Sequence, residues 1–301
     1  LIMFAKTNLQ YIFCIVMSFV IAACAGGGST TSSTTSAATT NPFTNWSNAV
    51  IGSAVNFSNG TSAVLATNES YSQSSSEVSA TLTNGASNTF TSINAAVAGN
   101  TASFSITNGD TLQSGFYGAT TIALNKSQTT VGTFANPAAF GFEYQTFGAW
   151  GGYGNSTVPA AAVSVGSPSP GSAIPPVGSL TFTGGATGYY VDPGKFGYLT
   201  NANMVAVVTF DNRTVTFNTT NTTVTGGPGM ALISTPNLNM TGNLSYAAGA
   251  NALSGTASTS SGMTGNINGK FYGPGLNELG GTYVVTGSGL GSMVGGFGGK
   301  R

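Results

Sequence analysis

Short runs of alternating apolar and polar residues extend from about residue 41 to the end of the chain, with turn residues between them. No long stretch shows the 3.6-residue period of an amphipathic helix. The clearest run covers residues 204–210, and Asp211-Asn212 joins it to a second β-rich run at residues 213–217. Two such runs around a short polar turn predict a β-hairpin. The pattern as a whole predicts an all-β fold, either a barrel or a sandwich.

A proline-rich stretch interrupts this pattern near the middle of the chain. Residues 158–178 hold five of the eleven prolines, together with several Gly and Ser residues. Proline cannot donate a hydrogen bond inside a sheet, so we expect a linker here. It would separate a β-rich domain at residues 41–157 from a second one at residues 179–301. The length of the second domain suits an eight-stranded antiparallel barrel with a filled interior.

The first residues have the features of an export signal. Lys6 precedes an apolar run at residues 11–21, and the small residues Ala22-Ala23 follow it. A basic start, a short apolar core and small residues before a cleavage site are typical of a secretory signal peptide. The run is too short for a membrane-spanning helix, which needs about 20 apolar residues. We therefore expect residues 1–23 to be a signal peptide.

Cys24 follows the small residues directly, and this arrangement resembles the lipobox of bacterial lipoproteins. In that family the thiol carries diacylglycerol and the new N-terminus is acylated, commonly with palmitate, which gives stable membrane anchoring. The Gly/Ser/Thr-rich residues 24–40 would then form a flexible tether. Ala25 replaces the Asp that often retains such proteins at the inner membrane, which favours the cell outer membrane and surface exposure. The alternative is a plain signal peptide with an incidental cysteine.

Composition excludes several classes of function. Seven Lys/Arg balance seven Asp/Glu, charged residues make up 5% of the chain, and histidine is absent. Clustered basic residues for nucleic acid are therefore missing, as are Ser-His-Asp and Cys-His catalytic centres. Zinc sites with His ligands and a proximal His for haem are excluded as well. No cofactor is expected, and we predict that the protein is not an enzyme; haem would need Tyr or Met ligands, and no pattern selects one.

Three segments carry a resemblance to a known family. Residues 269–274 read GKFYGP and are followed by ELGGTY at residues 278–283, and residues 294–300 read VGGFGGK. Together they resemble the closing strands of the transferrin-binding protein B-like lipoprotein β-barrel. Residues 141–150, GFEYQTFGAW, resemble a strand of the handle domain of the same family. The resemblance implies an antiparallel handle-like domain followed by an eight-stranded antiparallel C-terminal barrel.

The motif residues suit structural roles in the barrel. Phe271 and Tyr272 would face opposite sides of one strand, and Gly273-Pro274 would end it. Gly281 would allow a bend, Phe297 would fill the interior, and Glu278 would accept hydrogen bonds from turn N–H groups or from Lys270. This assignment concerns the following residues: Phe271, Tyr272, Gly273, Pro274, Glu278, Gly281 and Phe297.

A turn signal flanked by four aromatic residues is the candidate binding site. Asp192-Pro-Gly-Lys195 predicts a tight turn, with Tyr189 and Tyr190 before it and Phe196 and Tyr198 after it. Exposed aromatic side chains would make this hairpin a contact surface for a partner. The alternative is that the four rings pack inside or against the barrel.

The resemblance implies a binding protein and leaves its ligand open. The full-length family receptor has two lobes, whereas this chain has room for one. Single-lobe relatives include complement-regulator-binding and hemophilin-like proteins. We therefore expect an anchored surface lipoprotein that binds a host or environmental ligand, either a protein or a source of iron or haem. The alternative is a passive envelope component that coats the surface without a specific ligand.

Overall fold

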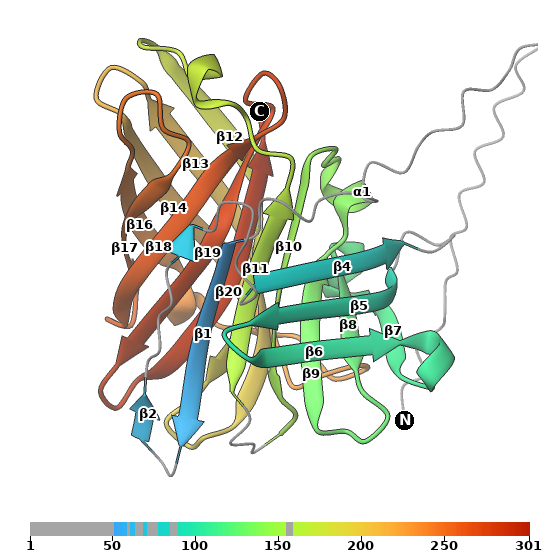
Figure 1. Ribbon diagram of the computed structural model, residues 1–301. Helices are drawn as coiled ribbons and strands as arrows, with labels where there is room; N and C mark the ends of the chain where they lie inside the picture. The colour runs from blue at the N-terminus through green and yellow to red at the C-terminus, as the bar shows by residue number, and fades with distance from the viewer. Residues whose placement is uncertain (1–50, 59–60, 64–68, 71–77, 85–89, 155–158) are drawn as a thin grey trace, which may run out of the picture. The chain divides into compact units, whose positions relative to one another are not determined.

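The computed structural model describes residues 51–58, 61–63, 69–70, 78–84, 90–154 and 159–301. Strands dominate this part of the chain, as the sequence predicts (Figure 1). The expected signal peptide, the expected tether and the predicted lipidation site Cys24 lie outside the described residues.

The C-terminal strands form a closed antiparallel barrel. The order is β13-β12-β20-β19-β18-β17-β16-β14, and pairing between β13 and β14 closes the ring of eight strands. The short β15 pairs with Thr223 and Val224 of β14, beyond the part of that strand that pairs with β16. These strands are β12 (Ser179–Val191), β13 (Gly197–Thr209), β14 (Thr214–Thr225), β15 (Ile233–Ser234), β16 (Met240–Ser245), β17 (Leu253–Thr259), β18 (Thr264–Tyr272), β19 (Glu278–Gly287) and β20 (Gly291–Lys300). The predicted eight-stranded barrel is confirmed.

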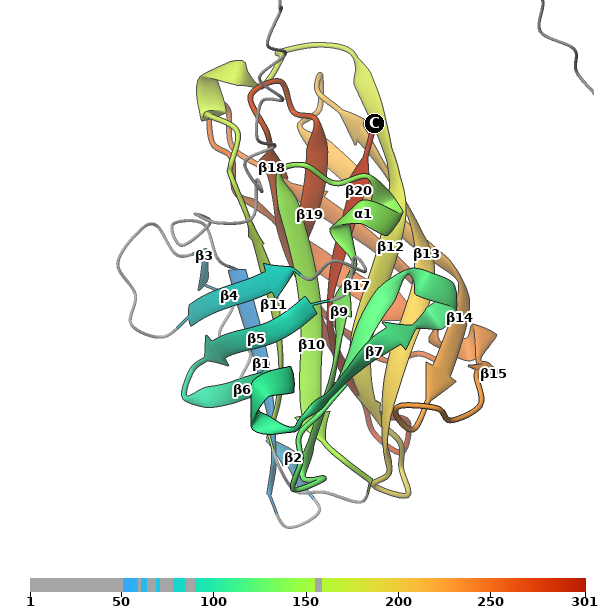
Figure 2. The same cartoon turned by 90° about the vertical axis from the view of Figure 1, so that its right-hand side faces the viewer.

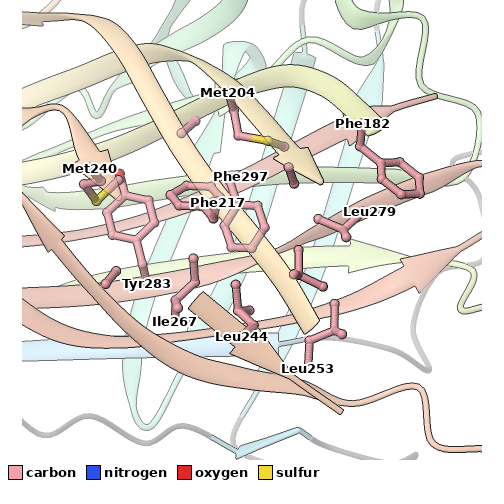
Figure 3. Packing of buried hydrophobic residues seen from close by; sticks show 14 of the residues in the cluster. Phe182, Met204, Phe217, Met240, Leu244, Leu253, Ile267, Leu279, Tyr283 and Phe297 are labelled. Atoms are coloured by element: carbon pink, nitrogen blue, oxygen red, sulfur yellow. The ribbon is translucent and has the colours of Figure 1, made fainter. Parts of the chain in front are cut away.

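Large apolar side chains fill the barrel interior (Figure 3). Alternate residues of each strand point inward, because successive side chains in a strand face opposite sides. Phe217 and Phe297 meet near the centre with ring centroids 4.8 Å apart. Burial of these rings removes apolar surface from water, which is the main force that favours folding. The barrel is therefore a packed core.

The preceding strands form the handle, which consists of two sheets. The larger sheet has the order β2-β1-β11-β10-β9-β8-β7, with β3 paired to β1, and the smaller one has the order β4-β5-β6. Their strands are β1 (Ile51–Ser58), β2 (Thr61–Ala63), β3 (Glu69–Ser70), β4 (Val78–Asn84), β5 (Phe90–Val97), β6 (Asn100–Ser105), β7 (Thr111–Gly115), β8 (Thr120–Leu124), β9 (Thr130–Ala135), β10 (Gln145–Gly152) and β11 (Ala160–Gly166).

Helical segments are short and lie in the connections. They are η1 (Ile106–Asn108), η2 (Phe116–Gly118), α1 (Pro137–Phe140), η3 (Gly171–Ala173) and η4 (Pro236–Leu238). Asn136 begins α1 by accepting a hydrogen bond from Ala138 N–H, and Gly141 ends it in the left-handed conformation. No helix in the described ranges is long and apolar enough to cross a membrane.

The expected linker at residues 158–178 is partly wrong. Residues Ala160–Gly166 form β11, which pairs with β1 on one side and β10 on the other. This stretch contains no proline, and its small residues fit between packed sheets. The connection to the barrel begins only after Gly166, where four prolines follow. The predicted hairpin is present, but its turn covers residues 210–213 and is longer than the Asp-Asn pair.

The two faces of β10 pack against different layers. Trp150 stacks on Phe134 of the neighbouring strand β9, and both rings point toward the smaller sheet, in the cluster that contains Phe104 of β6. Ala149 belongs instead to a cluster with Val284 and Val294 of the barrel. The larger handle sheet is therefore buried on both sides, and Figure 2 shows β10 and β11 within it.

Glycines on the barrel wall make room for the handle. A Cβ atom at Gly298 would lie 2.7 Å from the Phe147 ring, and one at Gly296 would lie 2.8 Å from Phe147 Cβ. Gly280 is similarly close to the Gln145 side chain. Strand glycines normally weaken a sheet, but here they allow two layers to approach closely. Their positions explain much of the glycine content of the last strands.

We predict that Gly298→Ala lowers the free energy of unfolding by about 1–3 kcal/mol, because the added methyl group displaces the buried Phe147 ring. Urea unfolding followed by tryptophan fluorescence measures this change. Gly275→Ala is the matched control, since its Cβ would meet only atoms at an ordinary 3.6 Å. Equal stability of the two variants would contradict close packing at this wall.

Candidate functional site

A carboxylate at the start of β19 joins the barrel to the handle. Glu278 accepts hydrogen bonds from the backbone N–H groups of Glu143, at 2.6 Å, and Tyr144, at 3.2 Å. These groups belong to the turn before β10, the segment whose sequence resembles the family's handle strand. Glu278 is therefore bonded to turn N–H groups, one of the two alternatives that the sequence left open, and not to Lys270.

Two further polar contacts cross the same junction. The Tyr272 hydroxyl lies 3.0 Å from the Ser164 hydroxyl of β11, and both residues are buried. Gln145 Nε2 donates to the carbonyl oxygens of Leu279, at 2.9 Å, and Gly299, at 3.3 Å. Buried polar groups are costly unless they are hydrogen-bonded, so these contacts fix the register between handle and barrel.

The other motif residues lie in or beside the barrel. Phe271 and Phe297 point into the core, whereas Tyr272 points out toward the handle. Gly273 has a φ of 81°, which favours glycine, and Pro274 follows it in an exposed turn. Gly281 lies against the backbone of Asn268 on the neighbouring strand. All these placements are structural and involve no exposed binding surface.

Burial raises the pKa of Glu278 to about 7. The hydrogen bonds from Glu143 and Tyr144 and the positive charge of Lys300 act in the opposite direction, and the negative charge of Glu143 adds to the rise. The Glu278 residue is only 2% exposed, which is why desolvation dominates. Glu278 therefore takes up a proton near neutral pH.

The raised pKa predicts that stability falls as the pH rises. The folded state binds the Glu278 proton up to about pH 7, whereas the unfolded state releases it near its ordinary value of 4.5. Between pH 5 and pH 7.5 the free energy of unfolding should decrease by about 1–3 kcal/mol through this group. Urea unfolding of wild type and Glu278→Gln at both pH values measures it. The variant should lose this part of the pH dependence, and an unchanged dependence would contradict the assignment.

The four aromatic residues of the candidate hairpin have different environments. Tyr189 is buried between barrel and handle, and its hydroxyl donates to the Gly152 carbonyl; burial raises the pKa of this phenol. Tyr190 and Tyr198 stack with centroids 6.4 Å apart, and both are partly buried. The Tyr190 hydroxyl donates to Leu290 O at 2.9 Å. These three rings hold the hairpin in place.

Phe196 alone of the four is widely exposed, with 50% of its surface accessible. Asp192 fixes the turn by accepting from Phe196 N–H through its carboxylate, at 2.9 Å, and from Lys195 N–H through its carbonyl. Lys195 has a φ of 68°, which completes the tight turn. The aromatic ring is thus presented to solvent by a well-defined loop.

Two apolar residues that the sequence did not single out lie at the same end of the barrel. Met230 and Ile233 are 51% and 57% exposed. Met230 lies in the connection after β14 and Ile233 begins β15, which pairs with the end of β14. β14 ends where β13 begins, as the pairing of Leu199 with Thr225 shows. We call Phe196, Met230 and Ile233 the barrel-end patch. The Gly- and Pro-rich residues before Met230 show no hydrophobic periodicity in the sequence. Only the order of the strands shows that this segment and the turn with Phe196 lie at the same end of the barrel.

The handle also reaches this end. The N–H of Gly197 donates to Gly154 O at 3.0 Å, and a Cβ atom on Gly227 would lie 2.8 Å from the Tyr153 ring. The two barrel loops are therefore supported by the end of β10. No group of three or more His, Cys, Asp or Glu within the described ranges could hold a metal ion. The patch offers apolar contact area rather than a chemical centre.

Solved structures with a similar fold have low sequence identity to this chain. Transferrin binding protein B from Haemophilus parasuis Hp5 is 14% identical with a TM-score of 0.46, and the match covers 84% of this chain and 45% of that one. The isotype 1 protein from serogroup B Neisseria meningitidis is 14% identical with a TM-score of 0.41, covering 83% and 43%. A protein described as a surface lipoprotein is 13% identical with a TM-score of 0.41, covering 83% and 98%.

This chain therefore spans less than half the length of the first two of these proteins. A comparison with curated protein sequences finds no match. A family model described as the C-lobe and N-lobe beta barrels of Tf-binding protein B matches residues 174–301. The match includes the GKFYGP segment and the glycine-rich last strand that suggested the resemblance. Over residues 174–301, the barrel of this chain is thus similar in sequence to the lobe barrels of Tf-binding protein B.

Proposed function

We propose that this protein is a lipid-anchored lipoprotein of the bacterial outer membrane that captures a protein ligand at the cell surface through the barrel-end patch. The observation that carries the proposal is the exposure of Phe196, Met230 and Ile233 together at one barrel end. Binding energy at protein interfaces concentrates in a few large side chains, aromatic ones above all. The family model that matches residues 174–301 describes the barrels of Tf-binding protein B, which supports this class of function.

The charge distribution indicates how such a ligand would be recognised. Lys270, Glu278 and Lys300 are the charged residues of the barrel strands, and they lie on β18, β19 and β20 beside the handle. The loops at the barrel end carry one charge of each sign, Asp192 and Lys195, on the turn that presents Phe196, so the barrel-end patch has no net charge for steering a partner. We infer that binding depends on apolar contact and shape and weakens little when salt is added. A polyanionic or strongly basic ligand does not fit this surface.

A passive coating role is the second candidate. The outward-facing residues of β14 and β16 are Thr, Asn and Ser, and most of them are exposed, for example Thr216, Asn218, Thr241 and Asn243. An uncharged, strongly hydrated wall of this kind needs no partner. The two roles are distinguished by whether a protein binds and by whether the patch is needed for it.

The first test measures binding to cells that display the full chain. Labelled iron-loaded transferrin, iron-loaded lactoferrin and fractionated serum proteins serve as probes. Phe196→Ser and Met230→Ser should each weaken binding at least tenfold, because each removes a large exposed side chain from the contact. Val177→Ser is the matched control, since Val177 is 65% exposed but precedes the opposite end of β12. Absence of binding by every probe would favour the coating role, and binding that the patch variants leave unchanged would contradict the proposed site.

The second test concerns the anchor. Cys24→Ser should abolish labelling by radioactive palmitate and release the protein from the membrane fraction, because no acyl chain would then hold it there. Cys14→Ser is the matched control, since Cys14 lies within the expected signal peptide. Undiminished labelling of the Cys24→Ser protein would contradict lipidation at this residue.

A further inference from the structure

Strand β7 leaves an open edge on the handle. It is the last strand of the larger sheet, and β8 is the strand that pairs with it within the described ranges. Its sequence, TLQSG, has no charged residue and no proline. Alternate residues of an edge strand present free N–H and C=O groups, which makes such a strand a template for pairing. Natural edges are usually protected by lysine, proline or a bulge, and β7 has none of these.

Exposed apolar side chains lie at both ends of β7. Ile106 in η1 is 51% exposed, and Tyr117 in η2 is 92% exposed. Phe116 and Tyr117 have φ values of 46° and 60°, a left-handed conformation that is unfavourable for bulky residues. Phe116 is buried at 3% exposure, so it anchors a turn that holds the neighbouring Tyr117 ring in solvent. Strained backbone of this kind tends to occur at functional positions.

The strand is compatible with pairing to a second copy of itself. A two-fold axis at Gln113 would place Thr111 opposite Gly115 and Leu112 opposite Ser114, with no like charges facing each other. Because the strands are antiparallel, η1 of one copy would approach η2 of the other. Ile106 and Tyr117 would then cover each other at both ends of the contact. This arrangement is isologous, the type found in most symmetric dimers.

We propose that two copies of this protein associate through antiparallel pairing of their β7 strands, which joins the two handle sheets into one continuous sheet. The pairing uses main-chain hydrogen bonds along the edge and apolar contacts at its ends. β6 is also an edge strand without charge, and Ile106 follows its last residue, but neither of its ends carries an exposed aromatic residue like Tyr117. The barrel-end patch takes no part in this contact, so the dimer and the proposed ligand site are independent.

Substitution of Gln113 by charged residues of like or opposite sign tests the proposal. Two differently tagged full-length copies are expressed in the same cells, and copurification of one tag with the other is measured. Gln113→Lys in both copies, or Gln113→Glu in both, should reduce copurification at least tenfold, because like charges face each other across the axis. Gln113→Lys paired with Gln113→Glu should restore it to near the wild-type level. Thr101→Lys, on the exposed face of β6, is the matched control and should have no effect.

A charge at the half-buried position of Gln113 could lower stability by itself. The pair of Gln113→Lys with Gln113→Glu controls for this effect, because both of its copies carry a charged substitution and yet should copurify. Absence of copurification between wild-type copies would overturn the proposal. Retained copurification of the two Gln113→Lys copies would also overturn it. Loss through Thr101→Lys together with no effect at Gln113 would place the contact on β6 and reject the assignment to β7.

Discussion

Close approach of the handle sheet to one wall of the barrel is the constraint on which the rest of the structure depends. It requires glycine at outward positions such as Gly296 and Gly298, where a methyl group would displace Phe147. The same approach removes water from Glu278, which is then satisfied by N–H groups of the handle. Packing and polar contacts thus specify a single arrangement of the two sheets. That arrangement also brings the end of β10 beside the barrel loops.

This constraint explains where charge and aromatic residues are found. The few charged residues of the barrel strands lie on strands next to the handle, where Glu278 has a specific structural role. Tyr189 and Tyr272 face outward from the barrel, and both are buried and hydrogen-bonded at the junction with the handle. Among the described residues, few large apolar side chains remain exposed; Val205 and Val207 lie on the barrel wall in β13, and most of the others lie in connections and short segments between the long strands. Phe196, Met230 and Ile233 form one such group, and Tyr117 with Ile106 flanks the handle edge.

The sequence predicted the all-β class, the eight-stranded barrel and the family resemblance, because alternation and the GKFYGP and GGFGGK segments reflect local backbone requirements. It placed β11 in a linker, since prolines nearby masked a short run of small residues that is a strand only through its neighbours β1 and β10. The sequence could not show that Phe196 is exposed and Tyr189 is buried, because the exposure of a ring in a hairpin depends on which other parts of the fold pack beside it. No local sequence pattern marked Met230 or Ile233 as exposed residues of a binding surface.

The central claim is that the barrel end, supported by the handle, is where a protein ligand binds. Hydrogen exchange of the chain with and without a serum protein that it captures tests this claim most directly. Amides in residues 191–197 and 225–234 should be protected by the ligand, while those of the connection at residues 167–178 should be unaffected. Protection confined to the outer faces of β14, β16 and β17, with none at the barrel end, would contradict it.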